Sequence, residues 1–294
     1  MQTPVKSNPF PDRGLTVGTL LRGNDLPHLE RTLLLAYALG MKRTALITYP
    51  ETRVSEPDAE HFRQLAARRL AGVPIAYLVG KREFYGIDLK VGPDVLIPRP
   101  ETELLVDAAL ERMPAGSSQS VLELGTGSGA IAIAIGRHHP TARIVATDIS
   151  GAALAVAADN KHVHRIENAS FIESDWYDRV PSERFDIIVS NPPYIAASDP
   201  HLALGDLRFE PKAALASGAD GMTAIRTIVE GAPSRLVEGG WLLFEHGFDQ
   251  AERCRHLLVL AGFASVSTRY DLAGIGRVSI GQWPRSVEAR AIAP

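Results

Sequence analysis

The feature that most constrains the fold of this chain is a repeated order of apolar segment, turn and helical segment that begins near residue 120. Apolar runs predict strands at 120–124, 143–147, 169–173, 185–190 and 240–245, with helical segments between them. Alternation of this kind indicates a parallel sheet with helices on both faces. Two further predicted strands, 264–268 and 277–280, are separated by a short polar stretch with glycine, which predicts a hairpin and an antiparallel edge strand.

The segment before residue 83 has a different, helical pattern. Ser55 and Asp58 resemble a capping box at the start of a helix. The buried stripe of that helix is predicted to contain Phe62, Leu65, Ala66 and Leu70. Short apolar alternations with turn residues then predict a β-hairpin. We therefore divide the chain into an N-terminal helical domain at 1–82, a β-hairpin linker at 83–101 and a larger domain at 102–294.

Composition excludes several classes of protein. Thirty-one Lys and Arg against 34 Asp and Glu give a net charge of −3, so the basic character typical of nucleic-acid binding is missing. Cys254 is the only cysteine, and we expect no disulfide and no metal site. No apolar run reaches the roughly 18 residues of a membrane span, and residues 1–14 do not resemble a signal peptide. We expect a cytoplasmic enzyme.

A glycine-rich turn follows the first predicted strand directly. Its residues are Gly125, Thr126, Gly127, Ser128 and Gly129, and a helix begins at once after them. Glycines let the backbone turn sharply and approach a ligand closely. Asp148 closes the next strand, where a carboxylate can accept hydrogen bonds from both ribose hydroxyls of a nucleotide. A carboxylate at a helix N-terminus is the alternative interpretation of Asp148.

The spacing Glu123-x-Gly125-x-Gly127-x-Gly129 resembles the first motif of class I S-adenosylmethionine-dependent methyltransferases. A dinucleotide-binding turn would favour glycine at the position of Ala130, so a nicotinamide-dependent oxidoreductase is the weaker alternative. The resemblance implies that Glu123 lies near the methionine moiety of S-adenosylmethionine. It also implies that adenine is held by Asp175, through a hydrogen bond, and by Trp176, through packing. Alone, Trp176 is equally consistent with an ordinary core residue.

The tetrapeptide Asn191-Pro192-Pro193-Tyr194 follows the apolar strand at 185–190. The prolines stiffen the loop and force Asn191 away from helical geometry. The Asn191 side-chain oxygen and a proline carbonyl can then accept both hydrogens of one NH₂ group, and Tyr194 can lie against a flat group. These features predict recognition of a planar –C–NH₂ group, either an amide or the exocyclic amine of a base, although a plain turn is the structural alternative.

The same groups offer a mechanism for methyl transfer. The lone pair of such a nitrogen is delocalised, so two acceptors on its hydrogens favour the positive charge that develops during the reaction. Alignment of nitrogen, methyl carbon and sulfur supplies much of the rest. We therefore assign catalysis to Asn191, Pro192 and Tyr194, without a dedicated strong base.

Along nearly its whole length the chain resembles the release factor glutamine methyltransferases, the PrmC/HemK family. The segments that carry the resemblance are 74–78, 82–86, 96–103, 123–129, 191–195, 209–211 and 244–247. It implies a Rossmann-like, seven-stranded sheet whose last strand is antiparallel, and an N-terminal domain that takes part in substrate recognition. It also implies that Gly125 to Gly129, Asp148, Trp176 and Asn191 bind the cofactor, which leaves as S-adenosylhomocysteine, and that Asn191 to Tyr194 bind the glutamine of a Gly-Gly-Gln loop.

Several alternatives stay open at this point. A sister family methylates a glutamine of a large-subunit ribosomal protein, and the stretch 98–103 favours the release-factor type. Adenine N6 in DNA presents the same chemistry but usually demands a basic surface. A scaffold that binds release factors without catalysis is the non-enzyme alternative. We expect a monomer that acts on release factors, with no membrane and no direct nucleic-acid requirement.

Overall fold

The computed structural model describes residues 15–23 and 25–285. The predicted lack of a signal peptide at 1–14 concerns residues outside these ranges. The chain divides into two compact units, Met1–Val79 and Gly80–Pro294. Within the described residues, no helix combines the length and the apolar character that crossing a membrane requires.

The first unit is built from short helices around a small apolar core. They are α1 (Val17–Arg22), α2 (His28–Leu39), α3 (Arg43–Thr48), α4 (Glu56–Leu70) and α5 (Ile75–Val79). Ser55 caps α4 by accepting a hydrogen bond from the Asp58 backbone N–H, as predicted. Phe62, Leu65 and Ala66 are buried, but Leu70, the last residue of α4, is 54% exposed. The predicted stripe is therefore wrong at Leu70 and ends one turn earlier.

The second unit contains a seven-stranded sheet in the order β5-β4-β3-β6-β7-β9-β8. Its strands are β3 (Ser120–Leu124), β4 (Arg143–Asp148), β5 (Ala169–Glu173), β6 (Phe185–Ser190), β7 (Leu236–Glu245), β8 (Ala264–Tyr270) and β9 (Gly276–Gln282). Strands β3 to β7 are parallel, and β9 is antiparallel to both β7 and β8. The predicted antiparallel last strand is confirmed.

The predicted place of that antiparallel strand at the edge of the sheet is wrong. The chain first forms β8 as the edge and then returns, so that β9 lies between β7 and β8. Burial explains this order. Val278 and Ile280 of β9 are buried, whereas β8 has no fully buried position. The more apolar strand therefore takes the inner position.

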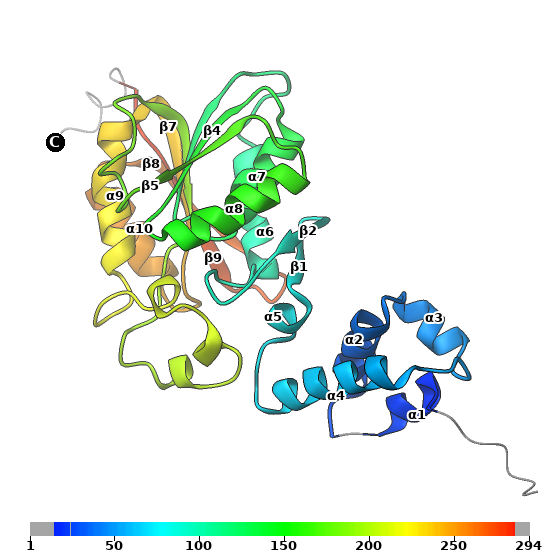
Figure 1. Cartoon of the computed structure of the whole chain (residues 1–294). Coiled ribbons are helices and arrows are strands. Elements are labelled where there is room, and N and C mark those ends of the chain that lie inside the picture. Colours follow the sequence, from blue (N-terminus) through cyan, green and yellow to red (C-terminus); the bar gives the residue numbers. More distant parts are fainter. Residues whose placement is uncertain (1–14, 24, 286–294) are drawn as a thin grey trace, which may run out of the picture. The chain divides into compact units, whose positions relative to one another are not determined.

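Helices cover both faces of the sheet (Figure 1). One face carries α6 (Glu103–Leu110), α7 (Ala130–His138) and α8 (Gly151–Val163), and the other carries α9 (Thr223–Arg235) and α10 (Ala251–Leu260). Successive strand residues point to opposite faces. Val121 and Ile187 therefore pack into the core beside α6 and α7, while Leu122 and Ile188 pack into the core beside α9 and α10. This double burial explains the continuous apolar runs of β3 and β6.

A hairpin of β1 (Lys81–Phe84) and β2 (Ile87–Lys90) packs into the core of this second unit. The buried Asn160 of α8 secures it, since its Oδ1 accepts from the Lys90 N–H at 2.7 Å and its Nδ2 donates to the Lys90 carbonyl at 3.0 Å. Short 3₁₀ helices occupy Pro100–Thr102, Pro200–Ala203, Leu207–Phe209 and Lys212–Ala214.

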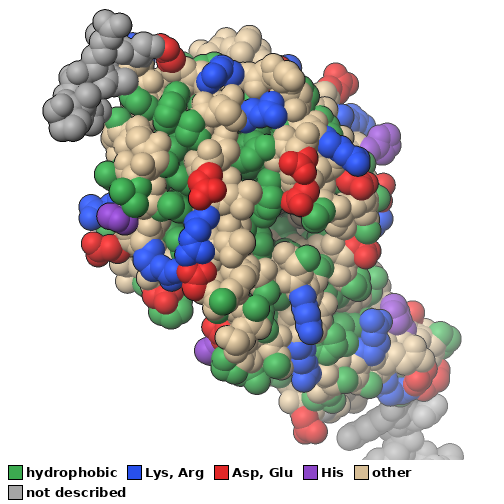
Figure 2. Space-filling model, turned by 90° about the vertical axis from the view of Figure 1, so that its left-hand side faces the viewer, with side chains coloured by type: hydrophobic (Ala, Val, Ile, Leu, Met, Phe, Trp, Pro, Cys, Tyr) green, Lys and Arg blue, Asp and Glu red, His purple; other side chains and the backbone are tan. Residues whose placement is uncertain are grey.

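The surface carries charges of both signs. On the face shown in Figure 2, Lys and Arg side chains are interspersed with Asp and Glu. Several of these charges are paired, for example Asp220 with both Arg226 and Arg253. This agrees with the net charge of −3.

Candidate active site

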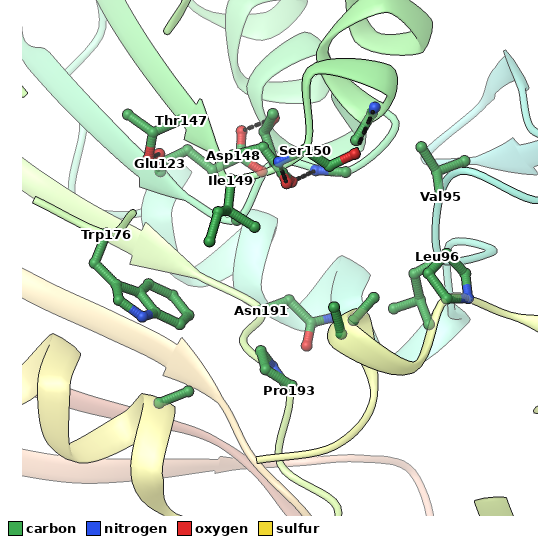
Figure 3. Close-up of a pocket in the computed structure, with 18 of the residues that line it drawn as sticks. Val95, Leu96, Glu123, Thr147, Asp148, Ile149, Ser150, Trp176, Asn191 and Pro193 are labelled. Atoms are coloured by element: carbon green, nitrogen blue, oxygen red, sulfur yellow. Dashed lines mark hydrogen bonds between the residues drawn. The ribbon is translucent and has the colours of Figure 1, made fainter. Parts of the chain in front are cut away.

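A cavity of about 520 Å³ opens at the carboxyl ends of the parallel strands. The strand order reverses between β3 and β6, which is where open parallel sheets bind their ligands. Figure 3 shows its walls, which come from the ends of β3, β4 and β6, the loop after β5, and the segment around Val95 and Leu96. Of the predicted site residues, the structure places Glu123, Gly125, Thr126, Gly127, Ser128, Asp148, Asp175, Trp176, Asn191 and Pro193 on this cavity. Gly129, Pro192 and Tyr194 lie outside its lining.

The glycine turn depends on left-handed backbone conformations. Gly125, Gly127 and Gly129 have φ angles of +74°, +55° and +82°, a region that favours glycine. The N–H groups of Gly125 and Thr126 both donate to the Thr147 carbonyl at 2.8 Å, which holds the turn against β4. A Cβ on Gly129 would lie 3.1–3.2 Å from Ile133 and Ala157 side-chain atoms. Gly129 therefore permits close packing of α7 and α8 rather than direct contact with the cavity.

Asp148 is oriented by the backbone around it. Its Oδ2 accepts from the Gly127 N–H at 2.8 Å, and its Oδ1 accepts from the Ser150 N–H at 2.9 Å. Burial raises the pKa of this carboxyl above its usual value. Because Ser150 is the N-cap of α8 and Asp148 also lines the cavity, the two interpretations of Asp148 are compatible.

Glu123 presents one free oxygen. Its Oε2 accepts from Thr126 Oγ1 at 2.8 Å and from the Ala132 N–H at 2.9 Å. Its Oε1 is buried and has no hydrogen-bond partner in the described part of the chain. Burial raises the pKa of Glu123 to about 8. A buried unpaired acceptor costs free energy, and an ammonium group of a ligand would satisfy it, so the residue fits the methionine amino group of S-adenosylmethionine.

An apolar part of the cavity lies between the loops after β4 and β5. Trp176 and Ile149 both line it (Figure 3). The Trp176 ring also packs against the core beside α9, so it is at once a core residue and a wall residue. Ile149 is 62% exposed although it is β-branched and apolar. Apolar walls of this kind suit a flat aromatic base, with Asp175 available as a polar group at the same wall.

Asn191 is fixed by a chain of hydrogen bonds that leads to the buried carboxylate of Glu245. Its Nδ2 donates to Thr102 Oγ1 at 2.9 Å, and Thr102 Oγ1 donates to Glu245 Oε2 at 2.6 Å. The Tyr194 hydroxyl donates to the other oxygen, Glu245 Oε1, at 3.1 Å. With its nitrogen held by Thr102, Asn191 retains its Oδ1 as an acceptor at the cavity.

Tyr194 is held behind the cavity. Its carbonyl accepts from Gln250 Nε2 at 2.9 Å, and a Cβ on Gly221 would approach that carbonyl oxygen to 2.3 Å. Burial and the neighbouring Glu245 raise the pKa of the Tyr194 phenol, so the hydroxyl stays a donor. Tyr194 therefore lies behind the cavity lining, and its predicted contact with a flat substrate group stays a prediction.

Glu210 ties two walls of the cavity together. Its fully buried carboxylate accepts from the Ile97 N–H at 2.9 Å and from Arg99 Nη2 at 2.5 Å. Leu96 and Pro98 on one side and Pro211 on the other line the cavity. The Arg99–Glu210 pair thus fixes the loop before α6 against the segment that follows β6.

Sequence reasoning assigned no role to Thr102, Ile149, Glu210 or Glu245. A signal for Glu245 was present, because it ends an apolar strand just as Glu123 interrupts one. Ile149 was also visible as an apolar residue directly after Asp148. Thr102 and Glu210 could not be identified in this way, since their partners are 89 to 143 residues away.

Comparison with known families adds two matches. Residues 101–218 match the family described as the methyltransferase small domain. Residues 18–80 match the family described as the PrmC N-terminal domain.

Individual relatives match over most of the chain. The release factor glutamine methyltransferase of Burkholderia pseudomallei (strain K96243) is 51% identical, over 92% of this chain and 96% of that protein. The protein of the same name from Xylella fastidiosa (strain 9a5c) is 47% identical, over 88% of this chain and 94% of the relative. Among solved structures, a methyltransferase from Pyrococcus furiosus is 19% identical, with a TM-score of 0.52 over 76% of this chain and 98% of that one. At this identity the similarity concerns the fold alone.

Proposed function

Because this chain belongs to the release factor glutamine methyltransferase family, we propose that its cavity binds S-adenosylmethionine at the glycine turn and a glutamine side chain of a peptide-chain release factor at Asn191. The product is a glutamine methylated on its side-chain amide nitrogen. The observation that carries the proposal is the hydrogen bond from Asn191 Nδ2 to Thr102, which leaves Asn191 Oδ1 to accept from a substrate NH₂ group.

The cofactor end of the cavity supplies complementary groups for each part of S-adenosylmethionine. Glu123 Oε1 accepts from the ammonium group, and Asp148 accepts from the ribose hydroxyls. Ile149 and Trp176 enclose the adenine, with Asp175 at its polar edge. The sulfonium group supplies an electrophilic methyl carbon when it is bound.

The acceptor end activates a poor nucleophile. Asn191 Oδ1 accepts one N–H of the glutamine amide, and we assign the other N–H to the Pro192 carbonyl. As the nitrogen attacks, it loses planarity and gains positive charge, so both hydrogen bonds strengthen in the transition state. The N–C bond forms as the bond from the methyl carbon to sulfur breaks, and the methylated, positively charged nitrogen is then acidic enough to lose one proton to water. Pro193 forms the adjoining wall, and Tyr194 supports Asn191 from behind.

Recognition of a whole protein needs more surface than one cavity offers. We assign this task to the N-terminal helical domain, 1–82, with 83–101 as the hairpin linker and 102–294 as the catalytic domain. The enzyme acts in this proposal as a cytoplasmic monomer that needs no nucleic acid. The mixed charges on the one face shown in Figure 2, together with the net charge of −3, differ from the basic character that extraction of an adenine from DNA demands.

Mass spectrometry of a purified release factor, after incubation with the protein and S-adenosylmethionine, tests the proposal. We expect one added methyl group on the glutamine of the Gly-Gly-Gln loop. Parallel reactions contain a large-subunit ribosomal protein and duplex DNA. Methylation of either of these, with none of the release factor, would overturn the assigned substrate. Binding of S-adenosylmethionine without any transfer would favour the scaffold.

A further inference from the structure

We infer that Thr102 and Glu245 are positioning residues that set which end of the Asn191 amide faces the substrate. This inference rests on the proposed function, because it concerns how the same site presents an acceptor to an NH₂ group. Both side chains are buried, with 4% and 2% of their surface exposed. They reach Asn191 from distant parts of the sequence, at the start of α6 and the end of β7.

The direction of the hydrogen bonds follows from the charge of Glu245. A carboxylate has no proton to donate, so Thr102 and Tyr194 must both donate to it. The hydroxyl hydrogen of Thr102 is then committed, and its oxygen can only accept. Asn191 must therefore turn its NH₂ group toward Thr102, at 2.9 Å, and its oxygen toward the cavity. Three hydrogen bonds thus order one amide group.

The same chain of groups can run in the opposite direction if Glu245 is neutral. A protonated Glu245 can donate to Thr102 Oγ1, which frees the Thr102 hydrogen to bond to Asn191 Oδ1. The Asn191 amide then turns over and presents NH₂ to the cavity. Two NH₂ groups cannot hydrogen-bond through their hydrogens, so the substrate amide loses its acceptor.

The surroundings of Glu245 make this reversal accessible. Burial and the nearby Glu101 raise the pKa of Glu245, while Thr102, Tyr194 and Arg277 act to lower it, and the result is a pKa of about 7. We therefore expect kcat to rise with pH through this range, as Glu245 becomes a carboxylate and the chain of donors points toward it.

The test compares Thr102→Val, Glu245→Gln, Thr102→Ser and wild type, with the full chain and a purified release factor. Single-turnover rates are measured at saturating S-adenosylmethionine across pH 6 to 9. Thr102→Val keeps the shape and removes the hydroxyl, and Glu245→Gln keeps the shape and removes the charge. Tyr177→Phe, which removes a hydroxyl that donates to the Ile228 carbonyl outside the cavity lining, is the control for folding effects.

We expect Thr102→Val and Glu245→Gln each to lower the rate by about 10- to 100-fold, since each misdirects one transition-state acceptor. The affinity for S-adenosylmethionine and the melting temperature should stay near wild type, and Thr102→Ser should recover most of the rate. The fall in the single-turnover rate below about pH 7, the pKa of Glu245, should persist in Thr102→Ser and disappear in Glu245→Gln. The double variant should be no slower than the slower single variant, because both act through Asn191.

If Thr102→Val and Glu245→Gln both fold and both keep single-turnover rates within about threefold of wild type, the inference fails. It also fails if the rate of Glu245→Gln still falls at low pH as the wild-type rate does. Side-chain amide resonances of Asn191, identified by their loss in Asn191→Ala, give a readout that needs no substrate. They should be protected from solvent exchange in wild type and lose that protection in Thr102→Val. If wild type methylates no release factor, the proposed function fails, and these resonances still decide whether the hydrogen-bond chain holds Asn191.

Discussion

Two buried glutamates, Glu123 in β3 and Glu245 at the end of β7, lie near the carboxyl ends of the two strands that flank β6. Among the described residues, 15–23 and 25–285, one oxygen of Glu123 has no hydrogen-bond partner, whereas Glu245 has a side-chain donor on each oxygen. Burial raises the pKa of both. The comparison suggests the two uses that we propose for a buried carboxyl: Glu123 binds a ligand through its free oxygen, and Glu245, with both oxygens bonded, orients a neighbouring group.

The two ends of the cavity differ in the same way. At the cofactor end, the glycine turn and side chains such as Glu123 and Asp148 face the cavity directly. The acceptor end is formed by side chains, Thr102, Asn191 and Glu245, that meet only in the folded chain. Substitutions at the cofactor end should therefore weaken binding of the cofactor, and substitutions at the acceptor end should slow transfer of the methyl group.

The largest expected effect separates these two ends directly. Asn191→Ala should lower kcat by about 1,000-fold, because it removes an acceptor that matters most in the transition state. The affinity for S-adenosylmethionine should change by less than about tenfold, since other cavity residues hold the cofactor. Rapid-quench assays and calorimetry measure the two quantities. Turnover that survives in this variant would contradict the assigned role of Asn191.

A second change tests how the cofactor end is held. Asn160 Nδ2 donates to the Ser128 carbonyl at 2.9 Å and also joins the hairpin through Lys90. Asn160→Ala leaves these buried groups unpaired and should lower the free energy of unfolding of the second unit by about 2–4 kcal/mol. Urea titration measures this free energy of unfolding. Asp159→Ala, which removes only an exposed ion pair with Lys90, is the control, and an equal loss there would show that Asn160 is not the anchor.

A third change sharpens the comparison between the glutamates. Glu123→Gln should weaken S-adenosylmethionine binding by about 10- to 100-fold, because it removes a charge-assisted hydrogen bond. Wild-type affinity should rise with pH through about 8, the pKa of Glu123, and this dependence should vanish in the variant. Glu245→Gln is the matched control. Similar dissociation constants for both variants in calorimetry would mean that the two carboxyls are not distinct in use.

The smallest effect concerns stability without ligand. Folding raises the pKa of Glu123 from 4.5 to about 8, so its protonated form is favoured in the native state. Its contribution to stability is therefore complete below pH 4.5 and is lost as the pH rises through about 8. Glu123→Gln should match wild type at pH 5 and melt a few degrees higher at pH 9. If Glu123→Gln has a lower melting temperature than wild type at pH 9, the buried charge of Glu123 does not destabilise the native state.

Much of the fold could be predicted from local patterns. The strands at 120–124, 169–173 and 185–190 have the predicted bounds. At 120–124 and 185–190 the signal is a nearly continuous apolar run that is buried on both faces of the sheet. The position of β9 between β7 and β8 could not be predicted, since a hairpin can add either of its strands to the sheet. Leu70 shows a second limit, because periodicity alone does not reveal where the packing partner of a helix ends.

The sequence by itself predicted a nucleotide-type cofactor site at the glycine turn and a reaction centre at the tetrapeptide 191–194. Left-handed glycines and proline-restricted loops are properties of neighbouring residues, so they are visible without the fold. The tertiary structure decided how Asn191 is oriented, because Thr102 and Glu245 lie 89 and 54 residues from it along the chain and contact depends on strand order. It also decided that Glu123 and Glu245, two acidic residues in similar apolar strands, differ in their hydrogen bonds, since only packing determines which oxygens find donors.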